Sequence, residues 1–362
     1  MIIHAPSQAS GGYASLVNAM AIALQRLQYN PPDISLLVST PHDNVNALVH
    51  FTMWESTRLF PLQVGILNTR RLIIVPNKRD ADDFRANGVI PEIVVCPLYC
   101  EGTFTSFAPM RPFRFITVGA EYGIPDRKRH HDLITAFQKA FPTQSDVELV
   151  IKRSPRCSPL ANFDRRITII TDDLKPEELK ALYGNCHVGI FPGGMESWNL
   201  PAAELAATGR ASILPLFRGP AEYLDRTCAF PLDFEMKQVP KESFRSYGEC
   251  PYVSVDGLIS AMQQAYNSPF DVYARGLAAA QRASEYSLAR FGVRLRNILH
   301  RYACQSGTKL ETGRPPVRDG HLGEPSRVDS GAEKVGDAAN PSVHDGSDDV
   351  GRIVASRSAV LH

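Results

Sequence analysis

The stretch Phe191-Pro-Gly-Gly-Met-Glu-Ser-Trp-Asn-Leu-Pro-Ala-Ala-Glu204 decides the fold and the candidate site of this chain. It follows an apolar run at 187–191, typical of a buried strand, and leads into a helix opened by Pro201. This order leaves unpaired backbone N–H groups at the end of the strand, where a phosphate or diphosphate is favoured. Glu196 and Glu204 beside them fit a sugar and a ribose, so together the features indicate a nucleotide-sugar. The alternative is a buried strand and a carboxylate that only offsets the helix dipole.

Similar signals flank this stretch. Residues 115–119 and 148–152 have the composition of short buried strands, and 179–183 has that of a helix. Strand and helix signals alternate in this way along most of the chain. Such alternation predicts parallel α/β sheets.

The motif resembles the donor-site signature of retaining glycosyltransferases with the GT-B fold, in particular glycosyltransferase family 4. Two glutamates separated by seven residues flank a Gly-Leu-Pro-like core in that family, and Glu196 and Glu204 have this spacing. Trp198-Asn199-Leu200-Pro201 occupies the place of the core, and Ser197 replaces a usual glycine. The likeness covers most of residues 113–300. It implies two Rossmann-like domains facing across a cleft, the first of them shortened.

The resemblance also implies roles for individual residues. Glu196, Lys128 and His42 are expected near the reacting sugar, although His42 is also compatible with a plain surface loop. Glu55 and Arg58, from a Thr-Met-Trp-Glu-Ser-Thr-Arg motif, are expected on the acceptor side, or paired with each other. The expected donor-binding residues are Gly11, Gly12, Lys128, Lys152, Arg153, Gly193, Gly194, Ser197, Trp198, Asn199, Leu200 and Glu204. The Gly11-Gly12 pair fits a simple turn equally well.

Two features depart from the family. Little room is left before residues 33–38 for the extra strand–helix units of a GT-B acceptor domain. Ala120 stands where many members carry an arginine that contacts the donor phosphate. The missing cation is expected from Arg127, Lys128, Lys152 or Arg153, and otherwise donor binding would be weakened or lost.

The domain boundaries follow from composition. We expect an acceptor-side domain at 1–108, a nucleotide-sugar domain at 109–285 and a helix at 286–304 that packs back toward the first domain. Beyond residue 304 large apolar residues nearly vanish. A segment of this composition cannot bury enough apolar surface to offset its ordering entropy, so we expect 305–362 to be a disordered tail.

Composition limits the partners. The chain has 362 residues, a net charge of +1 and seven cysteines without metal-type spacing. These values predict no bulk nucleic-acid binding and a cytoplasmic protein with reduced thiols. No apolar run approaches membrane-spanning length, while peripheral membrane association stays open.

Neither a cofactor nor a metal is expected. Asp80-Ala-Asp82 has the spacing of a metal-binding Asp-x-Asp motif but lies in a polar, helical stretch, so we reject it as a metal site. The resulting hypothesis is metal-independent transfer, with retention, from a UDP- or GDP-sugar to a hydroxyl of a glycan or glycoconjugate. The alternatives are an acceptor that is a protein or a modified nucleic-acid base, and a catalytically inactive nucleotide-sugar-binding subunit.

Overall fold

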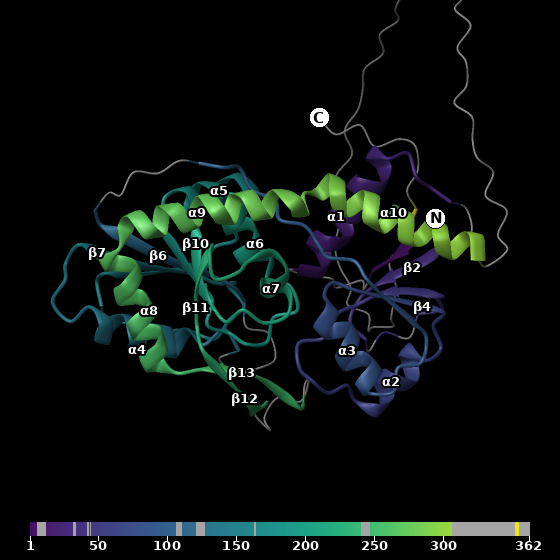
Figure 1. Cartoon of the computed structure of the whole chain (residues 1–362), viewed down its shortest axis with the longest axis horizontal. Helices are drawn as coiled ribbons and strands as arrows, with labels where there is room; N and C mark the ends of the chain where they lie inside the picture. The colour runs from purple at the N-terminus through teal and green to yellow at the C-terminus, as the bar shows by residue number, and fades with distance from the viewer. Residues whose placement is uncertain are drawn as a thin grey trace, which may run out of the picture.

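The protein has two parallel α/β domains that lie side by side (Figure 1). This computed structural model describes residues 1–5, 12–31, 34–41, 43, 45–105, 111–120, 127–162, 164–239, 247–305 and 352–354. The predicted fold class, two Rossmann-like domains built on parallel sheets, is confirmed. The predicted shortening of the first domain stays a prediction.

The N-terminal domain is built on a sheet whose first five strands are parallel and follow in chain order. Residues Leu72–Val75, in the strand next to the edge strand β5, are entirely buried, as expected for a strand covered on both faces. Its elements are β1 (Ile2–His4), α1 (Gly12–Arg26), β2 (Ser35–Val38), β3 (Val49–Phe51), α2 (Pro61–Leu67), β4 (Leu72–Val75), α3 (Lys78–Ala86) and β5 (Glu92–Val95).

The C-terminal domain has a six-stranded sheet in the order β11-β10-β9-β6-β7-β8, parallel throughout. The chain order reverses at β6, so the crevice beside this strand is the place where such sheets bind ligands. Its strands are β6 (Phe113–Val118), β7 (Val147–Lys152), β8 (Ile167–Ile170), β9 (Val188–Ile190), β10 (Ala211–Leu214) and β11 (Ala229–Pro231). Its helices are α4 (His130–Ala140), α5 (Pro176–Gly184), α6 (Leu200–Ala207), α7 (Gly219–Tyr223), α8 (Val255–Asn267) and α9 (Pro269–Ala283).

The last helix returns to the first domain. A short 3₁₀ turn (η1, Ser284–Tyr286) joins α9 to α10 (Leu288–Gln305), which runs over the N-terminal domain in Figure 1. A Cβ added at Gly292 would lie 2.9 Å from the Cβ of Ala23, so α10 packs closely on α1. A glycine at this position permits that approach.

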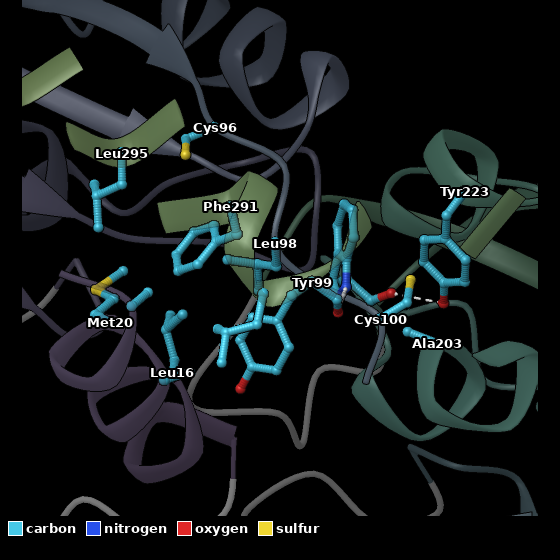
Figure 2. Packing of buried hydrophobic residues seen from close by; sticks show 14 of the residues in the cluster. Leu16, Met20, Cys96, Leu98, Tyr99, Cys100, Ala203, Tyr223, Phe291 and Leu295 are labelled. Atoms are coloured by element: carbon cyan, nitrogen blue, oxygen red, sulfur yellow. Dashed lines mark hydrogen bonds between the residues drawn. The ribbon is translucent and has the colours of Figure 1, made fainter. Parts of the chain in front are cut away.

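One hydrophobic core is shared by both domains. Figure 2 shows Leu16 and Met20 of α1 facing Phe291 and Leu295 of α10, with Leu98 and Tyr99 beside them. The same cluster continues to Ala203 and Tyr223 of the C-terminal domain. Since apolar burial is the main favourable term in folding, this shared core holds the two domains together.

A small antiparallel hairpin, β12 (Phe234–Gln238) and β13 (Glu249–Val253), leaves the C-terminal domain and lies between the two halves in Figure 1. The hairpin contacts the N-terminal domain at Ser56 and Thr57. The amide of Glu249 donates to the hydroxyl of Thr57 at 2.8 Å, and the hydroxyl of Ser56 donates to the carbonyl of Tyr247 at 2.8 Å. This contact between the domains was not predicted from the sequence.

Most of the predicted tail lies outside the described residues. Within it, however, Arg352–Val354 form a strand, β14, that pairs antiparallel with β1. The expectation of a tail without regular structure is therefore wrong for these three residues. The edge of β1 offers unpaired backbone groups, which can bind an added strand whatever its side chains.

Candidate functional site

The site is built where β9 ends. β9 lies between β6 and β10, and the amide of Phe191 donates to the carbonyl of Ile213 at 2.9 Å. The chain then leaves the sheet and enters α6. Asn199 begins this helix with a left-handed backbone, and its side chain accepts from the amide of Ala202 at 3.2 Å. The predicted order of strand, glycine loop and helix is confirmed.

A narrow cavity opens on the loop. Gly193, Gly194, Glu196 and Asn199 of the loop are among its lining residues. Its volume of ≈ 10 Å³ has room for about one water molecule. Small-molecule sites usually measure roughly 300 Å³ or more, so a nucleotide-sugar requires movement of these walls. The other lining residues are Phe191, Leu214, Pro215, Phe217 and Pro220.

Glu196 forms an ion pair with Lys128. Both side chains are largely buried, with 10% and 12% of their surface exposed. The lysine reaches the glutamate by passing Gly119, where an added Cβ would lie 3.0 Å from the lysine Cε. The structure thus brings together two of the three predicted catalytic residues, and the pair supplies a cation at the carboxyl end of β6.

Arg127 links this site to the N-terminal domain. Its Nη1 forms an ion pair with Glu55 and donates to the carbonyl of Met195 at 2.8 Å. A Cβ at Gly193 would lie 2.8 Å from the carbonyl oxygen of Arg127, so only a glycine lets the two segments approach this closely. Glu55 therefore faces the domain interface, and its partner is Arg127, not Arg58.

Lys152 and Arg153 lie next to these groups, at the end of β7. The amide of Gly119 donates to the carbonyl of Lys152 at 3.0 Å, which places the end of β7 beside the lysine of the ion pair. Lys152 Nζ donates to the carbonyl of Arg153 at 2.7 Å, and burial lowers its pKa. Arg153 is 3% exposed and donates to the carbonyl of Ser158 at 2.8 Å. Both cationic side chains are therefore buried at the carboxyl end of β7 and donate to backbone carbonyls.

Glu204 lies one turn into α6, in a different environment. The hydroxyl of Tyr183, on α5, donates to its Oε2 at 2.9 Å. Burial raises the pKa of Glu204 to about 7, and nearby Glu101 acts in the same direction. The tyrosine was not singled out from the sequence, although it belongs to a helix that was expected to lead to the glutamate loop.

Of the predicted donor-binding residues that the structure describes, only Gly193, Gly194 and Asn199 line the cavity, and Ser197, Trp198 and Leu200 of the same loop contact other parts of the protein. The Trp198 indole is buried, donates to the carbonyl of Tyr99 at 3.2 Å and packs on Tyr223 with ring centroids 5.0 Å apart. Ser197 donates from its hydroxyl to Asp80 of the first domain. Leu200 packs against the shared core. The side chains of Ser197, Trp198 and Leu200 therefore contact the other domain or the shared core and do not line the cavity.

The remaining predicted residues fall elsewhere. Gly11 and His42 lie outside the described residues, and Gly12 is the first residue of α1. Arg58 is exposed, and its backbone forms an isolated bridge with Tyr247, next to the hairpin. This contact between Arg58 and the segment next to the hairpin was not predicted from the sequence.

Asp80 and Asp82 point in opposite directions from α3. Asp80 is fully buried and pairs with Arg218, whereas Asp82 pairs with Lys78 at the surface, at 2.6 Å. Within the described part of the chain, no group of three or more His, Cys, Asp or Glu side chains could hold a metal ion.

The structure has the GT-B fold of glycosyltransferases. No protein-family model matches the chain, and neither does any curated protein. A sucrose-phosphate synthase from Thermosynechococcus elongatus superposes with a TM-score of 0.57 at 12% identity, over 81% of this chain and 78% of that chain. A UDP-forming trehalose-phosphate synthase from Burkholderia xenovorans, in complex with glucose-6-phosphate, gives 0.53 at 14% identity, over 79% and 76%. TarM from S. aureus, with UDP and α-GlcNAc-glycerol, gives 0.56 at 12% identity, over 77% and 58%.

In the part of the chain that the structure describes, none of the helices has the length and apolar character needed to span a bilayer.

Proposed function

We propose that this chain is a retaining glycosyltransferase that moves a sugar from a nucleotide-sugar to a hydroxyl acceptor. The observation that carries the proposal is the Lys128–Glu196 ion pair at the carboxyl end of a GT-B sheet, directly under the glycine loop. A cation here meets the diphosphate, and the carboxylate beside it meets sugar hydroxyls. One of the structural neighbours is a UDP-forming trehalose-phosphate synthase, which supports a nucleotide-sugar as the donor.

In this proposal the donor lies along the ends of β6, β7 and β9. Lys128, Lys152 and Arg153 neutralise the charge that develops on the departing diphosphate, with the N–H groups at the start of α6. Glu196 orients the donor sugar and Glu204 accepts from the ribose. These cations take the place of the arginine that Ala120 replaces, and the transfer needs no metal.

The acceptor would approach from the N-terminal domain. Its hydroxyl attacks the anomeric carbon on the face that the diphosphate leaves, and its proton passes to the departing phosphate oxygen. The new glycosidic bond therefore keeps the anomeric configuration. Glu55, held by Arg127, faces this side of the site. A docked pair of domains excludes water and so limits hydrolysis of the donor. We propose a glycan or glycoconjugate acceptor and a cytoplasmic location.

The test is donor consumption by the full chain with a panel of UDP- and GDP-sugars, with and without EDTA. We expect release of one nucleoside diphosphate, unaffected by EDTA, and loss of that release in Glu196→Gln. Binding of nucleotide without turnover of any donor, even with a mixed pool of cellular acceptors, would contradict transfer.

A second candidate is a nucleotide-sugar-binding subunit without activity of its own. Ala120 favours it, because it stands where many family members carry an arginine that contacts the donor phosphate. Calorimetry separates the two functions: the subunit would bind a nucleotide-sugar and return it intact, with or without acceptor.

A further inference from the structure

A buried polar cluster joins the two domains next to the loop between β9 and α6, residues 191–199, which we call the signature loop. We call it the interdomain cluster and define it as Asn77, Asp80 and Asp83 at the start of α3, with Ser197 and Arg218 of the C-terminal domain. The side chains of Asp80 and Arg218 are 0% and 1% exposed. Charged groups are rarely buried this completely without a structural or functional reason.

Hydrogen bonds connect every member. Arg218 pairs through Nη1 with Asp80 and through Nη2 with Asp83, the latter at 2.6 Å. The Ser197 hydroxyl donates to the second carboxylate oxygen of Asp80. Asn77 donates to the carbonyl of Ser197 at 2.8 Å while its own side-chain oxygen accepts from the amide of Asp80 at 2.8 Å. The residue that replaces the family's glycine is therefore a contact between domains.

The charges in this cluster balance. Arg79 pairs with Asp83 at 3.0 Å, so two guanidinium groups face two carboxylates. Arg218 has φ of +53° and ψ of −129°, a backbone conformation that is unfavourable for a residue with a side chain. It persists because its side chain is held from the first domain.

The turn that carries Arg218 also touches the signature loop directly. A Cβ at Gly219 would lie 2.3 Å from the Cα of Trp198 and 2.4 Å from the carbonyl oxygen of Ser197. The amide of Gly219 donates to that same oxygen at 3.0 Å. Ser197 is thus held by α3 on one side and by this turn on the other, one residue from Glu196.

We propose that Ser197, Asp80 and Arg218 are positioning residues, through which the N-terminal domain holds the Glu196 loop in the geometry that glycosyl transfer requires. The proposal rests on the proposed function of the loop. It adds that the donor site is complete only while the two domains are docked. A catalytic group displaced by about 1 Å can lose about 100-fold in rate, so small movements of this loop matter.

The hydrogen bonds that define the cluster do not involve Glu204, Lys152 or Lys128, the side chains proposed to bind the nucleotide. Glu204 contacts Tyr183, and Lys152 contacts the backbone of Arg153, both inside the C-terminal domain. Loss of the cluster is therefore expected to slow transfer while leaving the affinity for a free nucleotide nearly unchanged. A purely structural role would lower both together, through a smaller folded fraction.

The principal variant is Ser197→Ala in the full chain, since it removes one hydroxyl and leaves the ion pairs intact. We expect kcat to fall about tenfold, with the Kd for UDP or GDP within about twofold of wild type. Asp80→Asn is expected to lower kcat at least as far. Asp82→Asn is the matched control: it changes the same residue type on the same helix, but at an exposed pair with Lys78.

A double-mutant cycle tests whether the serine acts through the aspartate. If it does, Ser197→Ala adds less than about twofold to the loss already caused by Asp80→Asn. Fully multiplicative losses would contradict the proposed connection. A fall in nucleotide affinity that matches the fall in kcat would show that the cluster only supports the fold.

Amide hydrogen exchange makes the test independent of activity. In Ser197→Ala we expect residues 195–199 and the start of α3 to exchange at least about fivefold faster, although they belong to different domains, while Asp82→Asn matches wild type. Unchanged exchange at 195–199 overturns the proposal even in an inactive protein. If instead wild type turns over no donor but exchange responds as expected, the proposed function fails and the domain-to-loop coupling stands.

Discussion

The signature loop has two sides with different surroundings: one lines the cavity, and the other is buried against the N-terminal domain. The donor face presents Glu196 and Asn199 to a cavity, where Lys128 supplies a movable partner. The interface side buries Ser197 and Trp198 against the other domain, where the Ser197 hydroxyl donates to Asp80 and the Trp198 indole donates to the carbonyl of Tyr99. The comparison teaches that neighbouring residues of one motif serve chemistry and assembly separately. Substitutions on the donor face should change turnover with little loss of stability, whereas those on the interface side should change stability and, through the position of Glu196, turnover as well.

The largest stability effect is expected for Arg218→Met. It leaves Asp80 and Asp83 buried without this cation, which typically costs about 3–5 kcal/mol in the free energy of unfolding. Arg85→Met is the control, because its pair with Asp82 is about half exposed and should be worth about 0–1 kcal/mol. Urea unfolding monitored by circular dichroism measures both. Equal losses in the two variants would remove the distinction between the faces.

Glu196→Gln should have the largest effect on turnover. The amide keeps the shape of the side chain but loses the charge that orders Lys128 and the donor sugar, so kcat should fall about 100-fold. The affinity for free UDP or GDP should change by less than about threefold, because these ligands lack the sugar. Steady-state donor consumption and calorimetry check the two halves. A variant with unchanged kcat would assign the glutamate to the scaffold.

Lys128→Ala should impair binding and turnover together. Hydrogen bonds to charged groups contribute about 1.5–3 kcal/mol, so nucleotide diphosphate affinity should fall about 10- to 100-fold. Lys139→Ala, at an exposed lysine in the last turn of α4 and outside the cavity, is a suitable control. The same calorimetric titration applies. If affinity for the diphosphate and for the uncharged nucleoside falls equally, the lysine does not contact phosphate.

Glu204 should make nucleotide binding depend on pH. Burial raises its pKa to about 7, and ribose hydroxyls donate to the ionised form. Ligand binding therefore favours deprotonation, and affinity should rise by up to about tenfold between pH 6 and pH 8. The sign for stability is opposite: the raised pKa stabilises the fold below about pH 4.5, and this contribution is lost as pH rises through about 7.

Glu204→Gln is the control for that pH dependence, because the ligand's phosphate also titrates. The difference between wild type and Glu204→Gln isolates the carboxylate. We expect the variant to bind more weakly at pH 8 and with a flatter profile. Parallel profiles for the two proteins would mean that the ribose is held by other groups.

The smallest effect is expected from truncation after Gln305. The removed segment is poor in large apolar residues, and its described part is a three-residue edge strand on β1. We expect the free energy of unfolding to change by less than about 1 kcal/mol, since short edge strands add little buried area. A loss as large as that of Arg218→Met would show that the tail contributes to the fold.

Much of the C-terminal domain could be predicted because its signals are local. The buried strand before Phe191, the start of the helix after Asn199 and the glutamate spacing all lie within seventeen consecutive residues, 188–204. Periodicity and helix-start chemistry depend on near neighbours, so they survive without knowledge of the fold. The signature also placed Glu196 and Lys128 in one site, although 68 residues separate them.

The contacts between domains could not be predicted in this way. The sequence places Asp80 in a polar, helical stretch and does not single out Arg218, because no local pattern marks a pair that is 138 residues apart in the sequence. The hairpin contact at Thr57 and the hydrogen bond from Tyr183 to Glu204 escaped for the same reason.

The sequence by itself therefore determined the class of fold, the place of the donor loop and the residue types available for its chemistry. Only the tertiary structure decided which side chain faces the donor and which faces the other domain. The physical reason is the cost of desolvation. A carboxylate is buried at low cost only where a cation and a hydrogen-bond donor contact it. Arg218 and Ser197, both distant in the sequence, do this for Asp80.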